Sequence, residues 1–116
     1  MKRVAIPVRD ELLSETFGTC NHYEVFEIDK EVLRSYVLEI PAGTGMQDLP
    51  ELLERSGMTD VIAYQVDKQI ISLFASRKVD LFVGVRPDHP EALIDQYLRG
   101  RLESDPQVIS AITGKE

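Results

Sequence analysis

The chain has 116 residues, of which 43% are hydrophobic, and its 20 acidic and 13 basic side chains give a formal charge of −7. This length fits one domain, whose core must be mostly aliphatic because tryptophan is absent. An acidic chain is not expected to bind nucleic acid, because that binding depends largely on Lys and Arg at phosphates.

Membrane insertion and secretion are not expected either. The sequence contains no apolar run of about 18 residues, which a membrane-spanning helix requires. Its first residues, MKRVAIPV, become polar too soon for a signal peptide. The single cysteine, Cys20, cannot form an internal disulfide, so we expect a cytoplasmic protein.

The first half of the chain is rich in β-strand signals. Residues 4–8 form a short apolar run, which is typical of a central strand covered on both faces. A polar loop follows. The β-rich segments 23–28 and 33–40 are separated by a short connection, which predicts an antiparallel hairpin.

The second half alternates helices with short apolar strands. The strands are expected at residues 61–64 and 81–85. Three aspartates are expected to cap the helices that surround these strands: Asp48, Asp67 and Asp88. Apolar side chains at helical spacing mark the inner faces of the helices, and Gly57 and Gly100 end the first and third. These inner-face residues are Leu49, Leu52, Leu53, Ile70, Ile71, Phe74, Leu93, Ile94, Tyr97 and Leu98.

This order of elements predicts the α/β class. Strands joined through helices form a parallel set, and the hairpin adds antiparallel strands beside it. We therefore expect a five-stranded mixed sheet with helices packed on it, over residues 1–103. Residues 104–116 form a C-terminal extension, which is either a short added helix or a tail.

The polar loop before the hairpin is the candidate working end of the molecule. It contains Cys20 and, two positions further on, His22. A thiolate and an imidazole in one loop are a possible start of a metal site, although a four-coordinate site needs more ligands. A second subunit, His89, an exogenous thiol or inorganic sulfide could supply the others, and a homodimer across this loop is one way to complete the site.

Enzymatic motifs are absent from the sequence. It has no GxSxG, no phosphate-binding GxxxxGK and no HExxH. The carboxylates show no cluster of the kind that holds two metal ions in nucleases. We therefore expect a protein that is not an enzyme.

Layout and short motifs together resemble the dinitrogenase iron–molybdenum cofactor-binding family. The resemblance covers roughly residues 1–102 and rests on the opening strand VAIPV, the Phe17-Gly18 loop, the hairpin with its Pro/Gly loop, and the α-β-α-β-α order. It implies a ribonuclease-H-like fold and the binding or transfer of an iron–sulfur or iron–molybdenum cluster. Cluster donor or acceptor proteins would be the partners.

Two positions depart from the family pattern. Thr16 stands where members often have histidine before Phe17-Gly18, and Tyr64 to Asp67 replace a glycine-rich turn. By resemblance the ligand-contacting residues are Thr16, Phe17, Gly18, Tyr64 and Asp67. Cys20 and His22 are the candidate metal ligands. The alternative is a metal-free interaction or regulatory module on the same scaffold.

Overall fold

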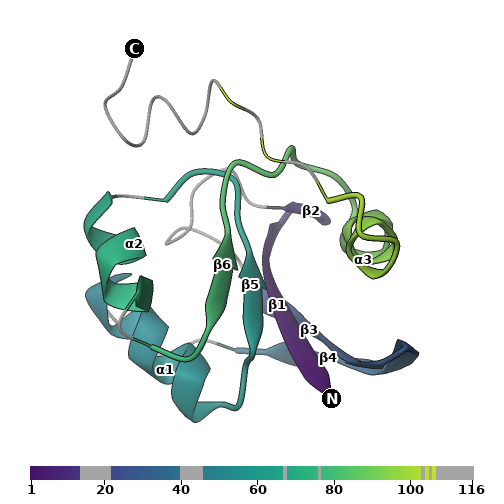
Figure 1. The fold of residues 1–116 in the computed structure, drawn as a ribbon, viewed down its shortest axis with the longest axis horizontal. Helices are drawn as coiled ribbons and strands as arrows, with labels where there is room; N and C mark the ends of the chain where they lie inside the picture. Colours follow the sequence, from purple (N-terminus) through teal and green to yellow (C-terminus); the bar gives the residue numbers. More distant parts are fainter. Residues whose placement is uncertain are drawn as a thin grey trace.

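A mixed β-sheet runs through the molecule in the strand order β4-β3-β1-β5-β6, with β2 paired to β1 as a sixth strand (Figure 1). The computed structural model describes residues 1–13, 22–39, 46–66, 68–75, 77–102, 104 and 106. The strands are β1 (Lys2–Arg9), β2 (Leu12–Leu13), β3 (His22–Asp29), β4 (Glu31–Leu38), β5 (Asp60–Ile62) and β6 (Asp80–Phe82).

The predicted position of the opening strand is confirmed. β1 is central and pairs antiparallel with β3 on one side and parallel with β5 on the other. β3 and β4 form the predicted antiparallel hairpin, and β6 pairs parallel with β5. Both faces of β1 are buried, which explains why residues 4–8 are continuously apolar.

The expected number of strands was wrong, because the described residues already form six strands rather than five. The additional strand, β2, folds back on the end of β1 through a two-residue turn at Asp10 and Glu11. Both turn residues have positive φ, 53° and 70°. Such turns match the twist of a hairpin, but they usually contain glycine or asparagine, which this turn lacks.

Among the described residues, helices lie on both faces of the sheet, which gives a three-layered arrangement (Figure 1). Helices α1 (Leu49–Arg55) and α2 (Lys68–Ala75) pack on one face with Ala5, Tyr23 and Val25. Helix α3 (Pro90–Leu98) packs on the other face with Val4, Ile6 and Phe26. Among the described residues, no helix is long and apolar enough to span a membrane.

The helix starts differ from the predicted caps. Asp48 is the N-cap residue of α1, but its side chain makes no capping hydrogen bond. It lies at the end of a 3-10 turn (Met46–Asp48) and has helical φ and ψ, whereas a capping side chain normally needs an extended backbone. Asp88 precedes the N-cap of α3, which is His89, and accepts the His89 N–H at 2.7 Å. Asp67 lies outside the described residues.

The predicted inner faces of the helices are largely confirmed. Leu98 is the exception, because it is 39% exposed at the end of α3. Gly57 ends α1 as expected, with φ of 87° and hydrogen bonds from Gly57 N to Glu54 O and from Met58 N to Leu53 O.

The outer strand of the hairpin, β4, is much more exposed than β3. Val32, Leu33 and Val37 of β4 are 42%, 54% and 53% exposed, and no described strand pairs with the outer edge of β4.

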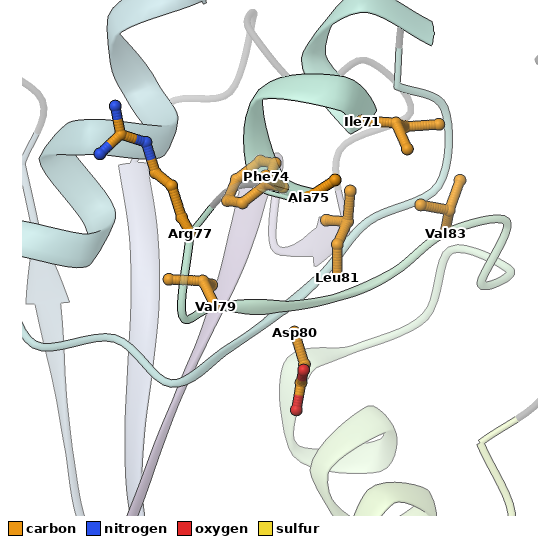
Figure 2. A pocket seen from close by; sticks show the side chains of 8 residues that line it. All are labelled: Ile71, Phe74, Ala75, Arg77, Val79, Asp80, Leu81 and Val83. Atoms are coloured by element: carbon orange, nitrogen blue, oxygen red, sulfur yellow. The ribbon is translucent and has the colours of Figure 1, made fainter.

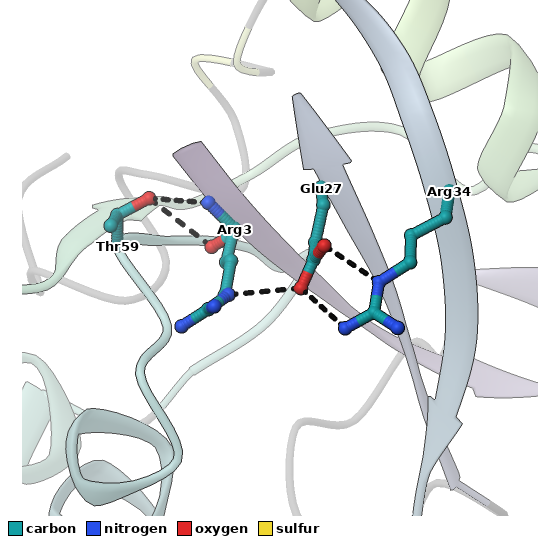
Figure 3. Close-up of polar contacts among 4 residues, drawn as sticks. All are labelled: Arg3, Glu27, Arg34 and Thr59. Carbon is teal, nitrogen blue, oxygen red and sulfur yellow. Dashed lines mark hydrogen bonds and ion pairs between the residues drawn. The ribbon is translucent and has the colours of Figure 1, made fainter. Parts of the chain in front are cut away.

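Glu27 is buried between two arginines on the α1–α2 face of the sheet (Figure 3). Arg34 Nε donates to Glu27 Oε1 at 2.6 Å, and Arg3 Nε donates to Oε2 at 3.1 Å. Thr59 holds the backbone of Arg3, since its Oγ1 accepts from Arg3 N at 2.9 Å. The hydrogen bonds from Arg34 first, and from Arg3, hold the pKa of Glu27 below its ordinary value against the opposing effect of desolvation.

Replacing this carboxylate should therefore destabilise the protein in a pH-dependent way. A lowered carboxyl pKa contributes stability above the ordinary carboxyl pKa, and this contribution is lost as the pH falls through the lowered value. Glu27→Gln should lower the melting temperature at pH 7, and the difference from the parent should close in acid. Thermal unfolding across this pH range is the measurement.

The matched control is Glu51→Gln, which removes an exposed partner of Arg55 at 3.9 Å. Exposed pairs of this kind contribute little, so the control should melt with the parent at every pH. Equal effects of the two substitutions would contradict the assigned role of Glu27.

Candidate functional site

The carboxyl ends of β1, β5 and β6 lie on the same side of the sheet, because the three strands are parallel. We call this row of strand ends the carboxyl edge. Ligands of open α/β sheets bind outside this edge. His22, the first residue of β3, pairs with Val8 near the end of β1 and therefore lies at the same edge. Of the two candidate metal ligands, His22 is thus placed where a ligand is expected.

The turn after β5 carries Tyr64, the second candidate site residue that the structure describes. Its ring is partly buried against the α3-side core. Its carbonyl accepts the Gly84 N–H at 2.8 Å, and the Ala63 N–H donates to Phe82 O at 2.7 Å. These bonds continue the pairing of β5 and β6 beyond the strand ends, so the two loops that follow the strands are held together.

Gly84 also lies at this edge, although it was not among the predicted site residues. It is buried and has φ of 78°, which side chains other than glycine rarely adopt. The sequence lacks the glycine-rich turn that the resembling family often has after this strand, but a glycine in the left-handed region is present after β6. In the sequence, Gly84 is one glycine within the apolar run 81–85. This run favours a strand there and gives no sign of a turn.

The segment between β6 and α3 is tied to β2. The Leu13 N–H donates to the Asp88 carbonyl at 3.0 Å, and His89 follows as the exposed N-cap of α3. The structure thus brings the start of α3, with His89, to the edge where His22 lies. α2 also begins at this edge, because it follows β5. Two helix N-termini therefore add positive potential here.

Carboxylates give this edge an opposing charge. Glu24 lies two residues after His22, so both occupy the same face of β3, the face on which α3 packs. Burial first, and then the negative charge of Glu91 at the start of α3, raise the pKa of Glu24, while His22 lowers it. Glu24 and Glu91 are thus close enough to repel, and a proton or a cation between them would relieve the repulsion.

The other predicted site residues cannot be placed. Thr16, Phe17, Gly18, Cys20 and Asp67 all lie outside the described residues. Within the part of the chain that the structure describes, no group of three or more His, Cys, Asp or Glu side chains could hold a metal ion. His22 alone therefore does not make a metal site. Further ligands would have to come from residues outside the described part of the chain or from another molecule.

A second ionisable cluster lies at the amino ends of β5 and β6, and its charges are balanced differently from those around Glu24. Asp60 is only 2% exposed and accepts hydrogen bonds from Thr59 Oγ1 at 2.6 Å and Tyr97 Oη at 3.2 Å, with Lys2 Nζ at 3.8 Å. Burial, followed by the charge of Asp60, raises the pKa of Tyr97 to about 12. This carboxylate is fully partnered, so the cluster is structural.

The electrostatics at Glu24 lead to a stability prediction. A raised carboxyl pKa means that folding favours the protonated form, so stability is greatest below the ordinary carboxyl pKa and declines as the pH rises through the raised value. Glu24→Gln should therefore raise the melting temperature at pH 7 and leave it unchanged in acid.

Glu91→Gln should give a smaller gain, because it removes only the second cause of the raised pKa. The control is Glu31→Gln on the exposed edge strand, which makes the same change in net charge. An equal gain from the control would show that net charge, and not this local repulsion, is responsible.

Comparison with known proteins gives relatives of both sequence and structure. No family model matches the chain. An uncharacterized protein of Methanocaldococcus jannaschii, MJ0580, is 24% identical over 108 residues, which cover 89% of this chain and 91% of the relative. The crystal structure of PH0822 superposes with a TM-score of 0.83 at 26% identity, over 92% of this chain and 97% of that one.

Two further solved structures are similar to the chain. A NifB protein from Thermotoga (TM1290), described as putative, is 25% identical with a TM-score of 0.68, over 90% of this chain and 93% of that one. The apo form of the orange protein from Desulfovibrio gigas has a TM-score of 0.73 at 13% identity, over 91% of this chain and 94% of that one. The chain is therefore similar along most of its length to these proteins, one of which is named as a NifB protein, and it shares their fold.

Proposed function

We propose that this protein is a non-enzymatic accessory protein that binds or carries an iron–sulfur or iron–molybdenum cluster, on a ribonuclease-H-like scaffold in the cytoplasm. The observation that carries the proposal is the position of His22, at the carboxyl edge of the parallel strands in a fold shared with a NifB-like protein. Cluster donor and acceptor proteins are the proposed partners.

The ligand chemistry supports iron. Cys20 precedes His22 by two residues, and a thiolate with an imidazole suits iron better than oxygen-only ligands would. The starts of α2 and α3 at the same edge favour an anionic group, such as a cluster with its sulfides. The carboxylates Glu24 and Glu91 work against an anion at the same place.

The number of ligands supports a dimer. One chain offers Cys20 and His22, and a four-coordinate site needs two more donors. A two-fold axis across this loop would bring two copies of each residue together, which makes a complete set. We therefore propose that the loaded form is a homodimer.

A metal-free interaction or regulatory module is the second candidate. Two observations favour it: the described residues contain no three-ligand group, and Tyr64 occupies the turn where a glycine would leave room for a ligand. In this case the same edge would bind a protein partner instead of a cluster.

Anaerobic reconstitution with iron and sulfide separates the two candidates. The parent should acquire visible absorption and bound iron and should elute as a dimer, whereas Cys20→Ser and His22→Gln should lose most of the iron. His89→Gln is the matched histidine control, because His89 is exposed at the start of α3, and it should retain the iron.

Three results would contradict parts of this proposal. If Cys20→Ser binds as much iron as the parent, the site is not ligated by cysteine. If the parent itself binds no iron, the cluster proposal fails and the interaction module takes its place. Loss of iron in His89→Gln alone would move the site to the start of α3.

A further inference from the structure

A groove of about 270 Å³ lies between α2 and β6, at the edge of the sheet away from the hairpin (Figure 2). Most of its lining is apolar, and the apolar residues come from α2 and from the β6 segment: Ile71, Phe74, Ala75, Val79, Leu81 and Val83. β6 is the last strand of the sheet in the described part of the chain, so the groove borders an open strand edge. We call it the α2–β6 groove.

Arg77 stands at one end of the α2–β6 groove and has an unsatisfied donor. Its Nη1 donates to Glu54 Oε1 at 3.0 Å, but its Nε is buried without a hydrogen-bond partner among the described residues. Buried donors nearly always have an acceptor. An occupant of the groove that brought a carbonyl to this end would supply it.

The path of the chain after α3 leads to the other end of the groove. Ser104 forms an antiparallel bridge with Val85, two residues beyond the groove residue Val83. A continuation in this antiparallel direction would run along β6 from Val83 towards Val79. Pro106, the last described residue, is helical, and proline is well tolerated in the first turn of a helix.

The sequence that follows Pro106 has one apolar face at helical spacing. Val108, Ile109 and Ile112 lie within about 100° of one another on a helix of 3.6 residues per turn, and Gln107 and Ser110 lie outside this arc. These are the only large apolar residues after Leu102. An amphipathic segment of this kind needs an apolar surface to cover.

We propose that residues 106–112 dock as a short helix in the α2–β6 groove of the same chain, with Val108, Ile109 and Ile112 against its apolar wall. The lengths agree: seven helical residues span about 10 Å, and the four-residue step from Val83 to Val79 spans about 13 Å of strand. The unpaired carbonyls at the end of this helix would then lie near Arg77 and provide the missing acceptor. The proposal does not depend on a bound cluster.

Paramagnetic relaxation tests this docking in the full chain. Cys20 is the only cysteine, so Cys20→Ser with Ser110→Cys places one spin label on the polar side of the proposed helix. Methyl signals of Ile71, Leu81 and Val83 should lose most of their intensity. The methyl signals of Val37, on the opposite edge strand β4, should be unaffected. If the methyl signals of the groove residues and those of Val37 were broadened equally weakly, the proposal would be overturned.

Two control experiments test the helical face and the intramolecular docking. Adding Ile112→Asp should restore the groove signals, because it places a charge on the apolar face. Gln107→Asp makes the same change in charge outside the apolar arc and should not restore them. Equal effects of the two substitutions would contradict the proposed helical face. Isotope-labelled chain without a spin label, mixed with spin-labelled chain, should show no broadening. Broadening in the mixture would show that a second copy's tail fills the groove and would overturn docking within one chain.

Discussion

Strand β1 is hydrogen-bonded on both edges and covered on both faces, and every other layer is positioned by it. Val4, Ala5 and Ile6 are completely buried, with Val4 and Ile6 facing α3 and Ala5 facing α1 and α2. Because β1 is antiparallel to β3 and parallel to β5, it also joins the hairpin to the crossover half of the sheet. The end of this strand therefore fixes where His22 and the loops after β5 and β6 meet.

The carboxylates at the two ends of the parallel strands differ in how their negative charge is balanced. Asp60, at the amino ends of β5 and β6, receives donors from Thr59 and Tyr97 and lies near Lys2, so burial costs it little. Glu24 lies nearer the carboxyl ends of the parallel strands, and burial first, and then the charge of Glu91, raise its pKa against the opposing effect of His22. Groups with a perturbed pKa are common at functional sites, so this difference favours the carboxyl ends of the strands as the working end.

Much of the fold could be predicted from the sequence because its strands and helices are strongly patterned. The apolar run 4–8, the hairpin and the three helices all have clear signals in the sequence. β2 could not be predicted, because Asp10 and Glu11 adopt positive φ without a glycine signal. The predicted caps of α1 and α3 were wrong, because a 3-10 turn precedes α1 and because α3 begins one residue later than Asp88 suggests, whereas the cap at Asp67 stays a prediction.

The candidate site was predictable only in part. His22 could be placed at the working edge from its neighbours in sequence, since it opens a strand after a polar loop. The importance of Gly84 and the repulsion between Glu24 and Glu91 depend on contacts between segments far apart in the chain. The sequence alone gives no such distances.

The order in which the strands are synthesised has a consequence for folding on the ribosome. β1 is made first, but its parallel partner begins at Asp60, and Arg3 is hydrogen-bonded to Thr59, 56 residues later. At about 5–20 residues per second, the chain spends several seconds with β1 made and its parallel partner β5 missing. During this interval β1 can pair only with β2 and the β3–β4 hairpin. The nascent chain should therefore expose one edge of β1 to chaperones until β5 has left the ribosome.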